Sequence, residues 1–298
     1  MSNDRLIRAE HFVWATARVL EQRRFQYLFQ NADPDGVLAA LASYETPDGG
    51  YGYALEPDGR GPVSQPLHVD FALRVLDDIG VITPATADRI CGYLDGVSRA
   101  DGGLPNVHPN IRDYPRAPWW ELDESASGSL IPTANIAGLL HHNGIRHPWL
   151  DRATQFCWAA IDAIEQTHPY VIDNCIAFLD QVPDRERAEK TADRLGTLVR
   201  DNGLVALTPD DPDYDRPAGY AAGEDHYPYD YAATPESLAR RWFSDAEFDQ
   251  ALDHLAATQA EDGGWSVSWL MWTPAVEPEW RGWATVRALR TLRSFNRL

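Results

Sequence analysis

The chain has 298 residues, of which 44% are hydrophobic and 24% are charged, a composition that supports a large globular core. Its formal net charge is −19, so we expect no nucleic-acid partner and no binding to anionic lipid surfaces. No segment approaches the ~20 consecutive apolar residues that cross a bilayer, and the first residues carry charges where a signal peptide is apolar. These features predict a cytoplasmic protein without a membrane span.

Apolar periodicity and punctuation predict two sets of helices that alternate along the chain. One set is amphipathic with a charged face, as expected of helices that face water, and the other carries small or apolar residues over more of its circumference. Strand signals are weak throughout. The expected helices cover 6–29, 35–45, 65–79, 84–98, 129–143, 147–165, 169–181, 185–200, 233–242, 244–260 and 280–296, and the charged set comprises 35–45, 84–98, 147–165, 185–200 and 244–260.

A turn built on Asp-Gly or Asn-Gly recurs along the chain. The clearest copies lie in 41–53, 93–106, 198–207 and 255–269. Glycine adopts the left-handed conformation that closes a helix, and the preceding Asp or Asn can bond to the backbone of the turn. We expect each repeat to hold two helices, and the wide middle gap indicates that a copy near 143–150 has lost its turn sequence.

The alternation of two kinds of helix predicts an all-α fold with two concentric layers. No Gly/Ser-rich or Pro-rich linker divides the chain, so we expect one domain over 1–298. A closed ring of helical hairpins also requires that the N-terminal helix packs against the last hairpin.

The three cysteines, Cys91, Cys157 and Cys175, form no Cys-x-x-Cys pair. An odd number of cysteines fits a reducing compartment. Each lies in an apolar helical context, so we expect buried and unreactive thiols.

The last copy of the repeat carries a Gln followed by a Gly-Trp pair, from Gln259 to Trp265. This motif resembles the repeat of squalene–hopene and oxidosqualene cyclases. In other copies Tyr51 and Leu104 replace the Trp, and Glu45 stands where the Gln would be. The similarity in organisation covers nearly the whole chain. It implies an (α/α)6 toroid, a fold that protein prenyltransferases and uncharacterised bacterial toroid proteins share.

The catalytic motifs of these families are absent or incomplete here. The cyclases that protonate their substrate use Asp-x-Asp-Asp, whereas the densest acidic string in this chain is DDPDYD at 210–215, in a predicted loop. The Asp-rich helix motif that binds magnesium diphosphate is missing. Prenyltransferases bind zinc through Asp-x-Cys, which Asp173 and Cys175 match, but a helix-capping Asp and a buried thiol explain the same residues. We expect no metal and no cofactor.

In a ring of hairpins, the loops that lead into the inner helices line the mouth of the cavity. The first covers 52–70, where Glu56 and Asp58 are candidate catalytic acids and Arg60 and Gln65 are candidate substrate-binding residues. An acid close to a second acid can hold a proton at neutral pH, whereas an acid beside an Arg forms an ionised pair. A loop brace, in which Arg60 ties down the carboxylates, is the alternative.

The second loop, 106–125, contains Trp119 and Trp120 directly before an acid. Tryptophan is uncommon in exposed loops, and its ring can stack on a sugar or face a cation. We expect both rings to bind substrate. The alternative is a hydrophobic lid folded onto the ring of helices.

The third loop, 217–237, holds a cluster of titratable and aromatic residues. His226 and Asp230 are candidates for general acid–base catalysis, and Tyr227 and Tyr229 are candidates for substrate binding. A solvated loop whose Tyr rings pack inward explains the same pattern.

The fourth loop, 265–283, adds Trp269, Trp272 and Trp280 as candidate substrate-binding residues. Together the four loops would bring aromatic and acidic side chains to one mouth, which favours a binding or catalytic site for a small hydrophobic molecule.

Three functions remain open at this stage. The first is a terpenoid-cyclase-like enzyme, in which a buried acid starts the cyclisation or isomerisation of an isoprenoid or another hydrophobic substrate and aromatic faces stabilise the cations. The second is a carbohydrate-active enzyme, a glycosidase or polysaccharide lyase, that uses paired carboxylates and Trp platforms. The third is a non-catalytic toroid that binds a ligand. The sequence defines neither the substrate nor the oligomeric state.

Overall fold

The structure is a computed structural model that describes residues 2–122, 124–125, 127–209, 211–221 and 223–298. These residues form twelve α-helices and three short 3-10 helices, with isolated bridges and no β-strand among them, so the all-α class is confirmed. In chain order the elements are α1 (Ser2–Thr16), α2 (Val19–Gln30), α3 (Asp35–Ala42), α4 (Pro66–Asp78), α5 (Pro84–Val97), η1 (Pro109–Ile111), α6 (Leu130–His142), α7 (Pro148–Asp162), α8 (Pro169–Leu179), α9 (Arg185–Asp201), α10 (Pro228–Tyr231), η2 (Leu238–Trp242), α11 (Asp245–Ala257), η3 (Pro274–Val276) and α12 (Glu277–Ser294).

Contacts within the chain divide it into two compact units. Residues 33–188 form one of them, the middle unit, and residues 1–32 with 189–298 form the other, the terminal unit, which holds both chain ends.

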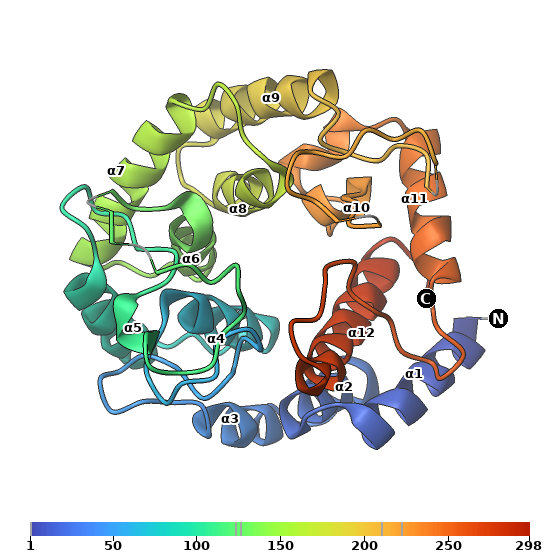
Figure 1. Ribbon diagram of the computed structural model, residues 1–298, viewed down its shortest axis with the longest axis horizontal. Coiled ribbons are helices and arrows are strands. Elements are labelled where there is room, and N and C mark those ends of the chain that lie inside the picture. Colours follow the sequence, from blue (N-terminus) through green and yellow to red (C-terminus); the bar gives the residue numbers. More distant parts are fainter. Residues whose placement is uncertain (1, 123, 126, 210, 222) are drawn as a thin grey trace. The chain divides into compact units, whose positions relative to one another are not determined.

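In the middle unit, α4, α6 and α8 pack side by side in one row, and α5 packs against α7 (Figure 1). The row is tight at Gly138 of α6, where an added Cβ would lie 2.4 Å from the carbonyl oxygen of Ala177 in α8. Polar side chains also join the row, because Asn135 of α6 donates to Asp70 of α4, which accepts from Arg74 at 2.9 Å. These three helices belong to the less charged set of the prediction.

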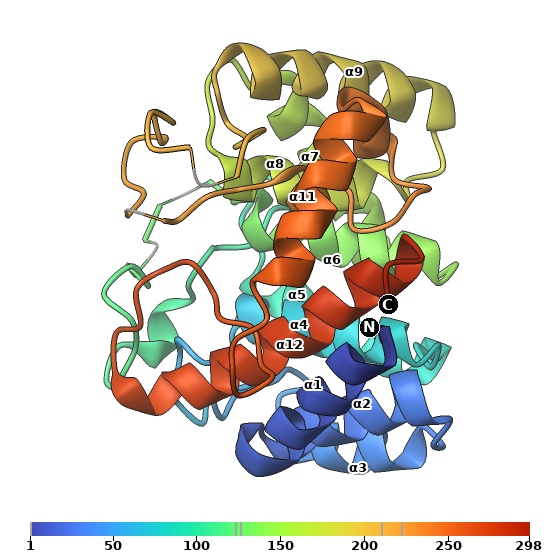
Figure 2. The same cartoon turned by 90° about the vertical axis from the view of Figure 1, so that its right-hand side faces the viewer.

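In the terminal unit, α12 lies against α1, α2 and α11 (Figure 2). Phe12, Phe25, Leu255 and Leu289 meet in its buried apolar core. Each such side chain contributes roughly 1.5–3 kcal/mol when it is fully buried. Gln259 joins the end of α11 to α1, since its amide donates to the carbonyl oxygen of residue 5 at 3.0 Å. The predicted packing of the N-terminal helix against the last hairpin is confirmed.

Three Asp-Gly-Gly turns, at 48–50, 101–103 and 262–264, share one geometry. In each turn the Asp Oδ1 accepts the N–H of the second glycine at 3.0–3.1 Å. The first glycine has φ from 91° to 95°, a conformation that L-residues rarely adopt. A Cβ there would also lie within 3.0 Å of a carbonyl oxygen in a neighbouring helix, that of Arg89, Arg152 or Arg8 respectively. Only glycine fits these positions, so the sequence repeat reflects a common local structure.

The copy expected at 198–207 is a different structure. Gly203 closes α9 as a left-handed C-cap, because the N–H of the following residue, Leu204, donates to the carbonyl of Val199. Gly144 closes α6 in the same way. The segment 143–150 is therefore not a lost copy of the turn. Of the connections that follow a helix of the charged set, the one from α7 to α8, at 163–168, lacks a glycine.

The single helix predicted over 6–29 is wrong, because the structure has two helices, α1 and α2. The chain becomes extended at Arg18 (φ −61°, ψ 158°). The break lies where α12 comes close, since a Cβ on Gly282 would be 2.8 Å from the Cβ of Ala17. The side-chain amide of Gln22 donates to the carbonyl of Ala17 at 3.0 Å and satisfies it locally.

The helix predicted over 233–242 is also wrong. The structure has the short helix α10 at Pro228–Tyr231 and the 3-10 helix η2 at Leu238–Trp242 instead. Pro228 is well suited to the first turn of α10, because the first residues of a helix need no N–H donor. Pro235 lies inside the predicted helix, where it supplies no N–H and disfavours the helical backbone conformation at Thr234. A continuous helix across 233–237 is therefore excluded.

The three cysteines are buried and free, as expected. Burial raises the pKa of Cys91 to about 12 and that of Cys157 well above its usual value, so both thiols stay protonated at neutral pH. Among the described helices, none combines the length and the apolar character that crossing a membrane requires.

Candidate functional site

Two of the predicted loops come together in the middle unit. Gly59 and Arg116 form an antiparallel bridge, the N–H of Arg60 donates to the carbonyl of Pro115 at 3.0 Å, and the N–H of Ala117 donates to the carbonyl of residue 58 at 2.8 Å. The segments 52–61 and 108–120, here called the loop pair, are thus held in register by their own backbones.

Both candidate acids of the first loop are buried in the loop pair. Glu56 is 6% exposed and Asp58 is 4% exposed. Asp58 Oδ2 accepts the indole N–H of Trp119 at 2.8 Å, and Glu56 Oε2 accepts the backbone N–H of Asp58 at 2.9 Å. One oxygen of each carboxyl group is therefore oriented by a fixed donor, which gives both acids a defined geometry.

The two tryptophans of the second loop have different environments. Trp120 is 4% exposed, and its ring lies over Gly59, where an added Cβ would be 2.2 Å from Cζ3. Trp119 is 43% exposed although its indole N–H is bound to Asp58. Trp120 therefore packs inward as a lid does, whereas Trp119 presents its ring at the surface beside a buried acid.

His68, at the end of the first loop, completes this cluster. It lies in the first turn of α4, is fully buried, and has its ring centroid 5.6 Å from that of Trp120. Its Nδ1 lies 3.2 Å from the carbonyl oxygen of Tyr51. Because a carbonyl only accepts, Nδ1 carries the hydrogen in this contact.

Gln65 and Arg60 have structural contacts in the loop pair. The Gln65 amide is buried, donates to the carbonyl of His108 at 3.2 Å and to Asn110 Oδ1, and accepts the N–H of His108 at 2.8 Å. Both ends of the Gln65 amide therefore brace 108–110 against the start of α4. Arg60 is half-buried and follows Asp58 by two residues.

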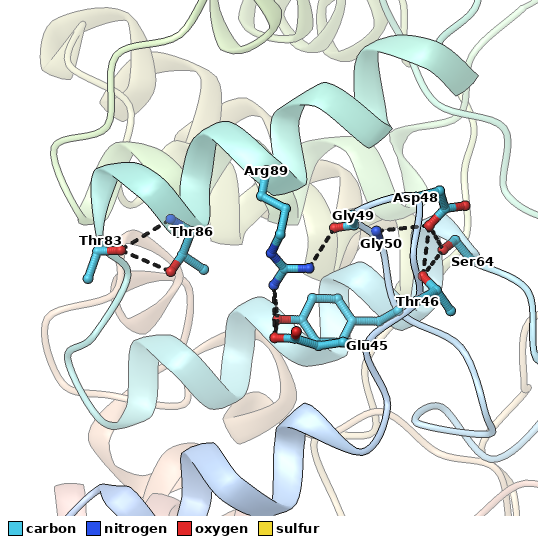
Figure 3. A network of polar contacts seen from close by, with 10 residues as sticks. Glu45, Thr46, Asp48, Gly49, Gly50, Ser64, Thr83, Thr86 and Arg89 are labelled. Carbon is cyan, nitrogen blue, oxygen red and sulfur yellow. Dashed lines mark hydrogen bonds and ion pairs between the residues drawn. The ribbon is translucent and has the colours of Figure 1, made fainter.

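The base of the first loop is anchored by an Asp48-centred network (Figure 3). Asp48 Oδ1 accepts from Thr46 Oγ1 at 2.7 Å, from Ser64 Oγ at 2.5 Å and from the N–H of Gly50 at 3.1 Å. Burial opposes ionisation of Asp48, but these hydrogen bonds outweigh it and lower its pKa. The two ends of the loop are thereby tied to one ionised carboxylate.

Arg89 of α5 forms a second anchor for the same loop (Figure 3). Its guanidinium donates to the carbonyl of Gly49 at 3.0 Å, to Glu45 at 3.0 Å and to the Tyr51 hydroxyl at 2.9 Å. Burial raises the pKa of Tyr51. The loop that carries the acids is thus fixed to a helix at its beginning.

A second cluster of candidate residues lies in the terminal unit, around Asp230. Asp230 Oδ1 accepts from Arg287 of α12 at 2.9 Å, and its Oδ2 accepts the N–H of Tyr227 at 2.8 Å. Burial raises the pKa of Asp230, and Arg287 offsets only part of this effect. Tyr227 stacks on Tyr229, with ring centroids 5.4 Å apart, and lies 4.8 Å from the ring of His254.

His226 lies next to this cluster but among rings. Its side chain is 9% exposed, and its ring centroid lies 5.7 Å from that of Tyr220 and 6.1 Å from that of Tyr231. Its carbonyl accepts the N–H of Ala206 at 2.7 Å. His226 therefore packs between two tyrosine rings of its own loop, and its role in acid–base catalysis stays a prediction.

The tryptophans of the fourth loop form an edge-to-face chain. Trp269 meets Trp280 at 4.9 Å between ring centroids, and Trp280 meets Trp283 at 5.6 Å. The guanidinium of Arg287 lies 5.3 Å from the ring centroid of Trp283, so the chain reaches the Asp230 cluster. Trp272 is half-buried.

The candidate residues therefore fall into two groups, one in each unit. The first and second loops meet in the middle unit, and the third and fourth meet through α12 in the terminal unit. The predicted convergence of all four loops on a single mouth stays a prediction.

The motifs weighed for metal binding supply no ligand cluster. No group of three or more His, Cys, Asp or Glu among the described residues is placed to hold a metal ion, and Cys175 is buried and free. In the acidic string at 210–215, Asp210 lies outside the described residues. Asp211 accepts the N–H of Asp213 at 2.9 Å, a local turn contact.

Comparison of the chain with protein-family models and with curated proteins found no match. A functional proposal therefore has to start from the geometry of the two groups.

Proposed function

We propose that the chain is a terpenoid-cyclase-like enzyme that uses Glu56 and Asp58 to protonate an alkene or an epoxide in a small hydrophobic substrate. The observation that supports this proposal most is the Asp58 carboxyl group, which is 4% exposed, bonded to the indole N–H of Trp119, and two residues from a second buried acid. Burial favours the protonated form of a carboxyl group, which is the form that can donate a proton to a substrate.

The proposed reaction is an isomerisation, so the product has the same atoms as the substrate. A carboxyl O–H gives its proton to one carbon of an alkene, which leaves a tertiary cation and a carboxylate. A second alkene of the same molecule attacks the cation and forms a carbon–carbon bond, and a neighbouring carbon then returns a proton to a carboxylate. No oxidant, reductant or cofactor is consumed.

The side chains around the acids suit this chemistry. Because Asp58 Oδ2 accepts the indole hydrogen, a proton on this carboxyl group belongs on Oδ1. The Trp119 and Trp120 rings are within the same loop pair, and the faces of aromatic rings attract cations. Preorganised groups of this kind stabilise charge that develops during a reaction.

We further propose that the two units complete an (α/α)6 toroid. The helix row of the middle unit, the packing of α1 against α12 in the terminal unit, and the three equivalent Asp-Gly-Gly turns support this arrangement.

A carbohydrate substrate is the second candidate, and the exposure of Trp119 favours it. A ring that is 43% exposed and hydrogen-bonded to a buried acid resembles a platform on which a sugar stacks beside a proton donor. The two candidates differ in the bond that reacts, so product analysis separates them.

The test compares acid variants on defined probes. Purified protein is incubated with geraniol, an acyclic C10 isoprenoid alcohol, and with p-nitrophenyl glycosides, and products are identified by gas chromatography–mass spectrometry and by p-nitrophenol release. We expect cyclised or isomerised geraniol, and a loss of at least about 100-fold in kcat for Glu56→Gln or Asp58→Asn. The melting temperature should change little.

Asp113→Asn and Glu261→Gln are matched controls, because both residues are exposed. They should retain wild-type turnover. Unchanged geraniol with wild-type protein, or full turnover by both acid variants, would overturn the cyclase proposal. Release of p-nitrophenol that depends on Glu56 or Asp58 would support the carbohydrate candidate instead.

A further inference from the structure

Exposed aromatic rings concentrate on the loop pair. Among the described residues, three aromatic side chains are exposed, namely Trp14, Tyr53 and Trp119, and two of them belong to the loop pair. Tyr53 is 46% exposed and lies three residues before Glu56. Tyr53 is not among the site residues predicted from the sequence.

The backbone of Tyr53 is in an unfavourable conformation. Its φ is 56°, and that of Ala54 is 62°, so two consecutive residues with side chains occupy the left-handed region. Glycine or asparagine adopts this conformation at lower cost. The N–H of Tyr53 donates to the carbonyl of Gly61 at 2.9 Å, which fixes the conformation across the loop.

The ring of Tyr53 does not account for this strain through burial, because nearly half of its surface faces solvent. Strained residues that persist in a rigid setting are concentrated at ligand-binding and catalytic sites. Here the setting is rigid, since the loop is held by the Asp48 and Arg89 anchors and by the bridge from Gly59 to Arg116.

We propose that Tyr53 is a substrate-binding residue, and that Tyr53 and Trp119 form an aromatic platform that holds the hydrocarbon part of the substrate beside Glu56 and Asp58. This inference rests on the proposed function and names the residues that give it affinity. Tyr53 has a left-handed backbone and is 46% exposed, and Trp119 is held in the same loop pair by its hydrogen bond to Asp58.

The test separates binding from chemistry. The Kd for geraniol is measured by equilibrium dialysis, and KM and kcat are measured by product analysis, for the wild type, Tyr53→Asn, Tyr53→Phe and Asp58→Asn. Asparagine suits the left-handed backbone but has no ring, whereas phenylalanine keeps the ring. Removing the contact of one aromatic ring should raise Kd and KM about tenfold or more.

We expect Tyr53→Asn to weaken binding and raise KM with kcat within about threefold of wild type, because uniform binding is lost. Tyr53→Phe, which keeps the ring, should bind geraniol more tightly than Tyr53→Asn, and Asp58→Asn should bind geraniol but lose kcat. The melting temperature of Tyr53→Asn should not fall, since the new residue tolerates this backbone.

Each result has a separate meaning. Wild-type Kd and KM in Tyr53→Asn would overturn the platform even if the acids prove catalytic, and so would a large fall in its melting temperature. Wild-type kcat in Asp58→Asn and Glu56→Gln would overturn the proposed function while leaving Tyr53 as a binding residue. Absence of geraniol binding by the wild type would overturn both.

Discussion

Replacement of Gly59 by alanine tests whether the Trp120 ring determines the geometry of the loop pair. Gly59 follows Asp58 directly and forms the bridge to Arg116. An added Cβ would lie 2.2 Å from Cζ3 of Trp120 and 2.5 Å from Cη2, whereas favourable carbon contacts are at about 3.5–4.0 Å. The ring or the backbone therefore has to move by roughly 1 Å or more.

Two responses bound the energetic effect. Overpacking that the loop pair absorbs by small shifts costs about 1–3 kcal/mol. Expulsion of the Trp120 ring, which is 4% exposed, would re-expose about 150–250 Å² of apolar surface and cost about 4–6 kcal/mol. Since the protein takes the less costly response, we expect Gly59→Ala to lower the free energy of unfolding by about 2–3 kcal/mol. Turnover should fall as well, because the carboxyl group of Asp58 moves with its neighbour.

Urea unfolding followed by circular dichroism measures this effect. Gly92→Ala is the matched control, because Gly92 lies on the exposed side of α5 and a Cβ added there would meet no atom within 4 Å. Alanine at this position should be neutral or should stabilise the protein by up to about 1 kcal/mol. The decisive comparison uses Trp120→Leu, which removes the clashing ring atoms. In that background Gly59→Ala should cost less than about 0.5 kcal/mol. An equal loss in both backgrounds would refute the role of the ring.

Three further predictions concern the terminal unit and the turns. Burial raises the native pKa of Asp230 above 3.8, so its contribution to stability is present at low pH and is lost as the pH rises through the native pKa. Urea unfolding at about pH 4 to 7 should therefore show the wild type losing stability relative to Asp230→Asn, and parallel curves of unfolding free energy against pH would contradict this. Gly263→Ala places a Cβ 2.1 Å from a carbonyl oxygen and should lower the free energy of unfolding by about 3 kcal/mol or more. Gly144→Ala has free space but a left-handed backbone, so it should cost only about 1 kcal/mol, and equal losses in the two variants would show that the clash at Gly263 is relieved. Gln259→Leu removes the hydrogen bond that joins the end of α11 to α1, so it should lower the free energy of unfolding by about 1–2 kcal/mol and increase hydrogen exchange in α1. Unchanged exchange in α1 would exclude the role of Gln259 as a link between the two helices.

The sequence predicted the regular parts of the fold because their determinants are local. The capping box at the start of α11 is such a local determinant, since the Ser244 hydroxyl accepts the N–H of Glu247 and the Glu247 side chain accepts the N–H of Ser244. The break at Arg18 was missed because it depends on the close approach of α12, which the sequence near Arg18 does not encode. The absence of a continuous helix over 233–242 has a local cause, the proline at 235.

The candidate site was predictable in its residue types but not in its contacts. Acids and tryptophans in loops were a visible signal, yet the hydrogen bond from Trp119 to Asp58 joins residues 61 positions apart and depends on the bridge between the loops. The positive φ of Tyr53 has no sequence signature, because glycine and asparagine are the residues expected in that conformation. The role of Gln65 as a brace likewise depends on a partner loop that local patterns do not identify.

The turns explain how one scaffold can carry different loops. In two repeats, the residue after the Asp-Gly-Gly turn accepts an N–H from the residue before the next helix, from Gln65 to Tyr51 at 3.1 Å and from Ser129 to Leu104 at 2.8 Å. Each loop is therefore closed at its base by a turn and by a backbone hydrogen bond, and its intervening residues are free to vary without changing where the helices begin. Functional residues are commonly placed on such loops over a rigid framework. In this chain, the 52–61 segment of one loop meets the 108–120 segment of the next, where Trp119 donates to Asp58 and the Trp120 ring lies over Gly59.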